Sequence, residues 1–177
     1  MPLCLHQTTS AAAGYRRSLE GYAKAGIRYV EVIPPHVEEF VRKDGMPAAK
    51  RLLSDLGLKA VSSGGVRGLA EPSPGRAKAL EELKSRVEMI RPGEIHHVHF
   101  QDVPKIPREL LENGTRDIPG DGVSPLARIL QALKKKGYTG PLSVELFYPH
   151  LQKGDPYEVA SEIRRKSEPI LRQAGLL

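Results

Sequence analysis

The sequence is poor in several residue types that mark particular classes of protein. It has no Trp, 5% aromatic residues and a single cysteine, Cys4. One cysteine excludes an internal disulfide framework and a zinc cluster built from cysteines. No apolar run approaches the ~18 residues of a membrane-spanning helix, and residues 1–14 lack the cationic and apolar stretches of a secretory signal. We therefore expect a cytoplasmic protein without a membrane partner.

The positive charge of the chain does not form a basic patch in the sequence. The 177 residues carry a formal net charge of +6. Residues 1–90 contain 14 Lys and Arg against 10 Asp and Glu, and residues 91–177 contain 13 against 11. Because this excess is spread out and aromatic side chains are scarce, few surfaces favour nucleic-acid bases. We expect no nucleic-acid partner, and the length suits a single domain over residues 1–177.

Short apolar runs alternate with helical patterns along the chain. Strands are expected at residues 3–6, 29–33, 59–62, 94–100 and 142–147. Helices are expected from residue 10 to about 25, at 37–43, 47–56, 76–90 and 124–136, and from residue 155 onward, where Pro169 should kink or split the last helix. Strands joined through helices run parallel, so the predicted fold class is α/β.

Two common phosphate-binding motifs are missing. No G-x-G-x-x-G or G-x-x-x-x-G-K-[ST] joins a strand to a helix, so neither a dinucleotide site nor a P-loop is predicted. Gly64 and Gly65 follow the third predicted strand, and we interpret them as part of a plain loop.

Three histidines fall within four residues of the fourth predicted strand. The two-residue period places His97 and His99 on one face, and His96 on the other face with Asp102. Imidazole is the commonest metal-ligating side chain, and a neighbouring carboxylate can fix its tautomer. We expect His99, at the functional end of the strand, to bind a metal, with His97 and Asp102 supporting it. For His96 and His97, ordinary exposed or hydrogen-bonded roles remain the simpler interpretation.

Carboxylates occur inside two other apolar strands. Burying Glu145 is costly unless it is paired or metal-bound, so it is the main candidate for a catalytic or metal-binding carboxylate. A structural ion pair is the alternative. Glu31 has a similar setting, which fits a structural or a substrate-binding role equally well. His6 ends the first strand and is expected at the same site, and Arg116 suits an oxyanion of the substrate.

Several segments resemble one family of proteins. These are residues 25–32 (AGIRYVEV), 92–102 (PGEIHHVHFQD), 116–122 (RDIPGDG) and 137–147 (GYTGPLSVELF). Together they resemble the sugar phosphate isomerase/epimerase family of xylose isomerase-like TIM barrels. The resemblance implies metal ligands on strands five to eight of a barrel, with His99 matching the seventh-strand ligand and Glu145 the eighth. It also implies that Arg116 faces the substrate and that a divalent ion such as Mn²⁺ or Mg²⁺ assists proton transfer next to a carbonyl.

The chain is shorter than such a barrel. A complete eight-stranded barrel needs roughly 250 residues, and five strands are predicted here. By this resemblance, the family's third helix runs directly into its sixth near residues 86–94, so strands four to six and their Glu and Asp ligands have no counterpart. We therefore expect an incomplete barrel of about five parallel strands and weak metal binding.

Three functions remain open from the sequence. The first is an isomerase or epimerase for a small sugar or hydroxy-ketone, and the second is an inactive, shortened relative that binds a partner. The third is a nuclease like endonuclease IV, which is disfavoured because the expected Asp-Arg-His motif reads Thr115-Arg116-Asp117. Since the missing strands would leave open sheet edges, we also expect a homo-oligomer.

Overall fold

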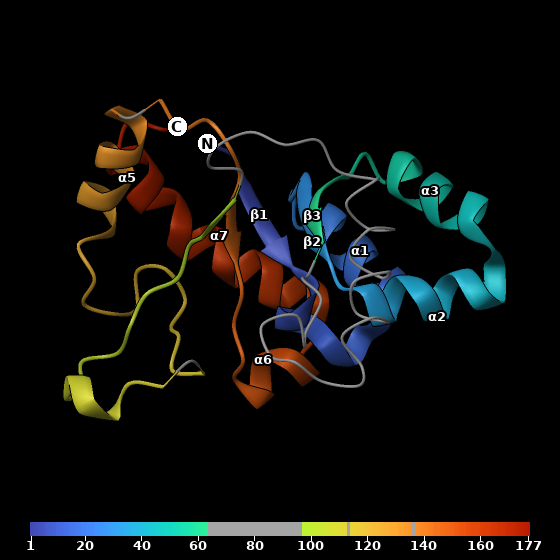
Figure 1. Cartoon of the computed structure of the whole chain (residues 1–177), viewed down its shortest axis with the longest axis horizontal. Coiled ribbons are helices and arrows are strands. Elements are labelled where there is room, and N and C mark those ends of the chain that lie inside the picture. Colours follow the sequence, from blue (N-terminus) through green and yellow to red (C-terminus); the bar gives the residue numbers. More distant parts are fainter. Residues whose placement is uncertain (64–96, 113, 136) are drawn as a thin grey trace, which may run out of the picture.

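One parallel sheet lies at the centre of the molecule (Figure 1). The computed structural model describes residues 1–63, 97–112, 114–135 and 137–177. The strands are β1 (Leu3–His6), β2 (Tyr29–Val32), β3 (Lys59–Ser63), β4 (Val98–His99) and β5 (Leu142–Val144). Their order is β3-β2-β1-β5-β4, and every pairing is parallel. The α/β class predicted from the alternating pattern is confirmed.

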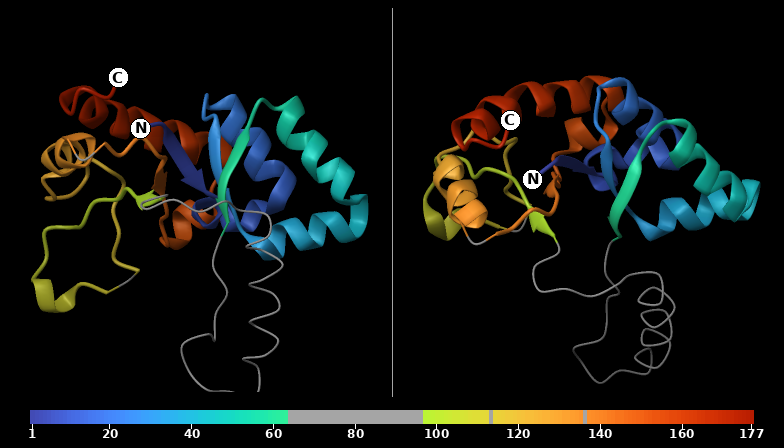
Figure 2. Two further views of the ribbon diagram at one scale, coloured as in Figure 1. Left: turned by 45° about the horizontal axis from the view of Figure 1, so that its top comes forward. Right: turned by 90° about the horizontal axis from the view of Figure 1, so that it is seen from above.

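Most of the helices in the described residues were predicted from the pattern, and α6 was not. They are α1 (Gly14–Lys24), α2 (Pro34–Asp44), α3 (Met46–Asp55), α5 (Leu126–Lys135), α6 (Pro149–Lys153) and α7 (Pro156–Gln173), with 3₁₀ segments η1 (Gln7–Ala13) and η2 (Arg108–Leu110). Asp155 caps α7 by accepting hydrogen bonds from the Tyr157 and Glu158 amides. Figure 2 shows α5 and the loop before it on one side of the sheet, with α2 and α3 on the other. No helix in the described ranges is long and apolar enough to cross a membrane.

The two faces of the sheet differ in chemistry. Leu5, Val30 and Val144 are fully buried in the hydrophobic core, together with side chains of α1 and α7. Because side chains alternate along a strand, the intervening residues point to the other face. That face carries polar groups: His6 pairs in register with Glu31. The alternation therefore produces an apolar face for packing and a polar face that is available for a site.

Four details differ from the predicted elements. The segment after β1 is a 3₁₀ turn before α1 begins at Gly14. Pro34 and Pro35 begin α2, because proline fits the first turn of a helix, where its missing N–H needs no partner. Helix α7 continues through Pro169 and is not split. Strand β5 ends at Val144, three residues earlier than predicted, so Glu145 lies just beyond the sheet.

The sheet is open, as expected for an incomplete barrel. In the described residues β3 and β4 are its two edge strands and do not pair with each other. The predicted fourth strand is seen at Val98–His99, and its earlier part lies outside the described residues. So do the predicted helix at 76–90, the proposed deletion near 86–94, the Gly64-Gly65 loop and His96.

Candidate active site

The Glu31 carboxylate lies at the centre of the polar face and meets side chains from all the surrounding strands. Its Oε1 accepts a hydrogen bond from Ser62 Oγ of β3 at 3.3 Å, and its Oε2 accepts one from Ser143 Oγ of β5 at 2.8 Å. His6 Nε2 of β1 lies 3.5 Å from Oε1. Since a carboxylate buried this deeply needs partners, these groups account for its stability there.

Two histidines approach Glu31 from β4 and the residue before it. Nε2 of His97 lies 2.7 Å from Glu31 Oε2, and Nε2 of His99 lies 3.3 Å from the same oxygen. The other ring nitrogen of His97, Nδ1, is buried and has no hydrogen-bond partner in the described part of the chain. One ligand atom from each of Glu31, His97 and His99 lies within 4.8 Å of the others. This donor set is suited to a divalent cation.

His6 connects the two carboxylates of the site. Its Nδ1 accepts a hydrogen bond from the Thr8 amide at 3.1 Å, so the proton of the neutral ring is on Nε2. Nε2 lies 3.5 Å from Glu31 Oε1 and 3.5 Å from Glu145 Oε1. Burial lowers the pKa of His6, although both carboxylates oppose this. His6 is therefore placed as a neutral donor between Glu31 and Glu145.

Glu145 pairs with Arg116 beside the histidines. Arg116 Nη1 lies 2.6 Å from Glu145 Oε2, and the guanidinium lies over the Phe147 ring, 4.7 Å from its centroid. The next residue along the loop, Asp117, accepts a hydrogen bond from Tyr148 Oη at 2.9 Å. These contacts tie the loop that carries Arg116 to the segment after β5, so the ion pair has a fixed place.

Neighbouring side chains shift the pKa values of Glu31 and His99 in opposite directions. Burial alone would raise the pKa of the Glu31 carboxyl, but the nearby His97, His99 and His6 side chains bring it well below its usual range. The contact with Glu31 raises the pKa of His99. Glu31 is thus an anion that favours a positive charge beside it. On the same face burial raises the pKa of Cys4 to about 12, so its thiol stays protonated.

Asp102 has a different place from the one predicted. Its carboxylate accepts hydrogen bonds from the backbone amides of Val103, Gly120 and Ser124 at 2.9, 3.1 and 2.8 Å. Its own backbone forms a two-way bridge with Asp117. The prediction that Asp102 orients a histidine is therefore wrong, because its oxygens are used by loop amides. Asp102 shapes the loop that presents Arg116.

The structure brings most of the predicted residues together. His99 Nδ1 lies 3.4 Å from Glu145 Oε2, which confirms that these two side chains share one site. The cluster comprises His6, Glu31, His97, His99, Arg116 and Glu145. Two contributors were missed, Ser62 and Ser143. The alternation that places Ser143 on the same face as Glu145 was the available signal, but serine is too common for that signal to be specific.

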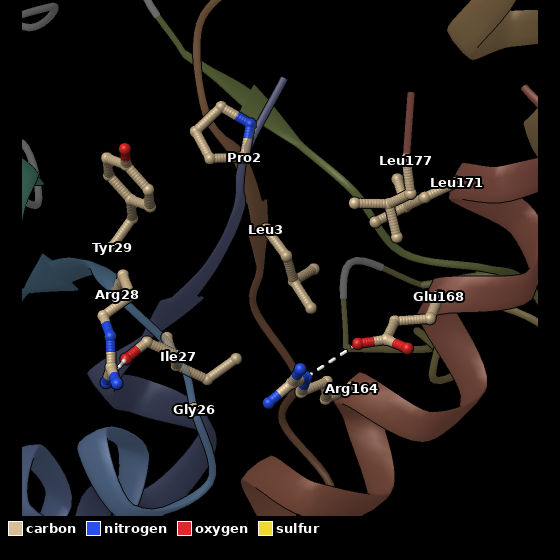
Figure 3. A pocket seen from close by; sticks show the side chains of 10 residues that line it. All are labelled: Pro2, Leu3, Gly26, Ile27, Arg28, Tyr29, Arg164, Glu168, Leu171 and Leu177. Atoms are coloured by element: carbon tan, nitrogen blue, oxygen red, sulfur yellow. Dashed lines mark hydrogen bonds and ion pairs between the residues drawn. The ribbon is translucent and has the colours of Figure 1, made fainter. Parts of the chain in front are cut away.

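A hollow in the surface lies at the opposite end of the strands. Figure 3 shows it between the start of β1 and helix α7, lined mainly by apolar side chains. Its arginine, Arg164, donates hydrogen bonds to Glu168 Oε1 and to the Ala25 carbonyl at the end of α1. In parallel α/β folds ligands bind at the carboxyl ends of strands. We therefore assign Arg164 to structure and place the candidate site at the other end.

The fold and the cluster define a parallel α/β protein of the TIM-barrel type, with carboxylates and imidazoles gathered beside its strands. A family model described as xylose isomerase-like TIM barrel matches residues 86–167. An inosose isomerase of Halalkalibacterium halodurans is 42% identical over 52 residues. That match covers 29% of this chain and spans only 18% of the length of the relative.

Solved structures show the same fold over nearly the whole chain. A xylose isomerase domain protein of Alicyclobacillus acidocaldarius aligns with a TM-score of 0.81 and 16% identity, covering 99% of both chains. A xylose isomerase domain-containing protein of Salmonella typhimurium aligns with a TM-score of 0.72 and 13% identity, covering 96% of this chain and 97% of that one. The chain is therefore xylose isomerase-like, in sequence over residues 86–167 and in fold nearly throughout.

Proposed function

We propose that the protein is an isomerase or epimerase of a small sugar or hydroxy-ketone that moves a proton next to a carbonyl with help from a divalent cation. The observation that carries this proposal is the convergence of Glu31, His97 and His99 beside a separate carboxylate, Glu145. Proton transfer next to a carbonyl needs a group that stabilises the oxygen and a base that reaches the carbon-bound proton. The cluster contains candidates for both.

The residues present fit a divalent cation such as Mn²⁺ or Mg²⁺. Nδ1 of His97 is buried and lacks a hydrogen-bond partner among the described residues, and such groups are rare unless something else satisfies them. Glu31, His97 and His99 would hold the ion. A bound cation would polarise the carbonyl and hydroxyl oxygens of the substrate.

Glu145 is the proposed base. Its Oε2 is held by Arg116, and its Oε1 lies 3.5 Å from His6 Nε2. His6 has no free nitrogen for a second proton, because Nδ1 is occupied by the Thr8 amide. It therefore orients the two carboxylates, and Glu145 remains the group that takes the proton from carbon and returns it.

The name of the 42% identical relative suggests a first substrate to test, an inosose. Arg116 is committed to Glu145 and to the Phe147 ring. An uncharged polyhydroxy ketone fits such a site better than a phosphorylated sugar, because a phosphate would compete with Glu145 for the guanidinium.

Deuterium exchange tests this function without knowledge of the final product. The protein is incubated with an inosose and Mn²⁺ in D₂O, and loss of the proton next to the carbonyl is followed by ¹H NMR. We expect exchange well above that with Mn²⁺ alone. Glu145→Gln should slow it by about 100-fold or more, since a positioned base contributes about 10²–10⁴-fold.

Glu20→Gln is the matched control, because Glu20 is an exposed glutamate on α1 paired only loosely with Arg16 at 3.8 Å. It should leave exchange unchanged. Wild-type exchange equal to that of Mn²⁺ alone, with an inosose and with simple ketoses, would contradict the enzymatic function and favour a binding module.

A further inference from the structure

A buried threonine far away in the sequence holds the backbone on both sides of Glu145. The Thr9 hydroxyl donates a hydrogen bond to the Val144 carbonyl at 3.2 Å and accepts one from the Leu146 amide at 3.1 Å. Thr9, Val144 and Leu146 are all fully buried. One hydroxyl thus satisfies two backbone groups that flank the candidate base.

This contact explains why the chain leaves the sheet where it does. Strand β5 ends at Val144, so a buried amide one residue beyond Glu145 needs a partner other than a neighbouring strand. The Thr9 hydroxyl supplies that partner. These two hydrogen bonds hold the backbone on both sides of Glu145, whose side chain extends into the cluster and contacts Arg116 and His6.

The residues before Thr9 arrange the other side of the site in a similar way. Gln7 is fully buried, and its Oε1 accepts a hydrogen bond from the Ile33 amide, directly after the strand that carries Glu31. Its Nε2 donates to Ser18 Oγ at 2.7 Å, which anchors the side chain on α1. The short segment from His6 to Thr9 therefore contacts both carboxylate-bearing segments.

We propose that Thr9 is a positioning residue for Glu145, acting through the backbone hydrogen bonds of its hydroxyl. This inference rests on the proposed function insofar as Glu145 is the base. A misplacement of the base by about 1 Å is enough to lower the rate of proton transfer by about 100-fold. Thr9 touches no reacting atom, so its effect should appear in catalysis and in the Arg116–Glu145 contact together.

The test compares Thr9→Val, which keeps the shape and removes the hydroxyl, with Thr9→Ser, which keeps the hydroxyl. Ser167→Ala is the control, because Ser167 is equally buried but lies on α7. The first readout is the ¹H–¹⁵N NMR signal of the Arg116 guanidinium, assigned by its loss in Arg116→Lys. The second is deuterium exchange on an inosose with Mn²⁺.

We expect Thr9→Val to shift or broaden the Arg116 signal and to lower kcat for exchange by about 10- to 100-fold with little change in KM. Thr9→Ser should keep the wild-type Arg116 signal and the wild-type kcat for exchange. Ser167→Ala should change neither the signal nor kcat. If Thr9→Val does not fold, Thr9→Cys takes its place, since a thiol fills the position and hydrogen-bonds weakly.

The two proposals fail in different ways. A folded Thr9→Val protein with an unchanged Arg116 signal overturns the positioning role, and so does a Thr9→Ser protein that behaves like Thr9→Val. Absence of exchange in the wild type overturns the proposed enzyme, and the Arg116 signal then still decides whether Thr9 positions Glu145.

Discussion

Glu31 Oε2 and His97 Nε2 lie 2.7 Å apart, although β1 and β5 separate their two strands in the sheet. Neighbouring strands are about 4.8 Å apart, so a flat sheet would keep these side chains well out of reach. Their contact shows that the sheet curls toward its polar face as a barrel wall does. Curvature therefore brings candidate ligands together although the sheet is open.

Cation binding should depend on Glu31 more than on any surface carboxylate. We expect wild-type protein to bind Mn²⁺ weakly in a calorimetric titration, because few protein ligands are present. Glu31→Gln and His97→Ala should each lower the affinity by at least about tenfold, as removal of residues that hold or orient a metal does.

Glu39→Gln is the control for this titration, because Glu39 is exposed on α2 and pairs with Lys43. It should bind Mn²⁺ like the wild type. Loss of binding in Glu145→Gln, with Glu31→Gln unaffected, would instead place the cation beside Glu145 and contradict the ligand set proposed above.

Replacement of Asp102 should destabilise the fold. In Asp102→Asn, the side-chain NH₂ group would replace one of the two carboxylate oxygens, which both accept hydrogen bonds from backbone amides. Two donors would then face each other, and at least one hydrogen bond would be lost. The expected cost in the free energy of unfolding is about 1.5–3 kcal/mol, the usual worth of a hydrogen bond to a charged group. Urea unfolding followed by circular dichroism measures it, and an unchanged midpoint at neutral pH would refute the structural role.

The effect of Asp102→Asn should also depend on pH. Burial raises the pKa of the Asp102 carboxyl, but hydrogen bonds from the Ser124 and Val103 amides outweigh it and hold the pKa below its ordinary 3.8. A lowered pKa stabilises the fold above the unfolded-state value and loses this effect as pH falls through the folded-state value. The difference between the two proteins should be constant above about pH 5 and shrink below about pH 4.

Part of the site could be predicted from local patterns alone. The two-residue alternation places His97 and His99 on one face, and both do reach Glu31. It did not predict that Glu31 would be their common partner, because that contact depends on the strand order and the curvature of the sheet. Neither property is encoded near these residues in the sequence.

The end of β5 shows the same limit. The apolar run predicted a strand through residue 147, since Leu146 and Phe147 favour strands as much as Val144 does. The strand ends earlier because Thr9, separated from Val144 by 135 positions, takes the next hydrogen bonds. Likewise, the loop amides that surround Asp102 come from up to 22 positions away.

Packing of α1 against α7 depends on Gly21. A Cβ at this position would lie 2.6 Å from Cβ of Pro156 and 2.8 Å from the Tyr157 amide nitrogen. Backbone atoms cannot move away cheaply, so Gly21→Ala should lower the free energy of unfolding by about 1–3 kcal/mol, as overpacked cores do. Gly114→Ala is the control, since no described atom lies within 4 Å of its Cβ position. Equal melting temperatures for the two variants would contradict this packing.

The open sheet leads to the last prediction, self-association. In the described part of the chain β3 and β4 each pair on one side only, and unpaired strand edges favour contact with another chain. We expect a homodimer in sedimentation velocity at micromolar concentration. Ala60→Lys adds a charge to an exposed position of β3 and should shift the equilibrium toward monomer, because charged residues protect sheet edges.

Ser54→Lys, an exposed change on α3, controls for the added charge and should leave the dimer intact. A monomeric, cooperatively unfolding wild type would show that neither edge drives association, and a dimer unaffected by Ala60→Lys would exclude the β3 edge as the contact.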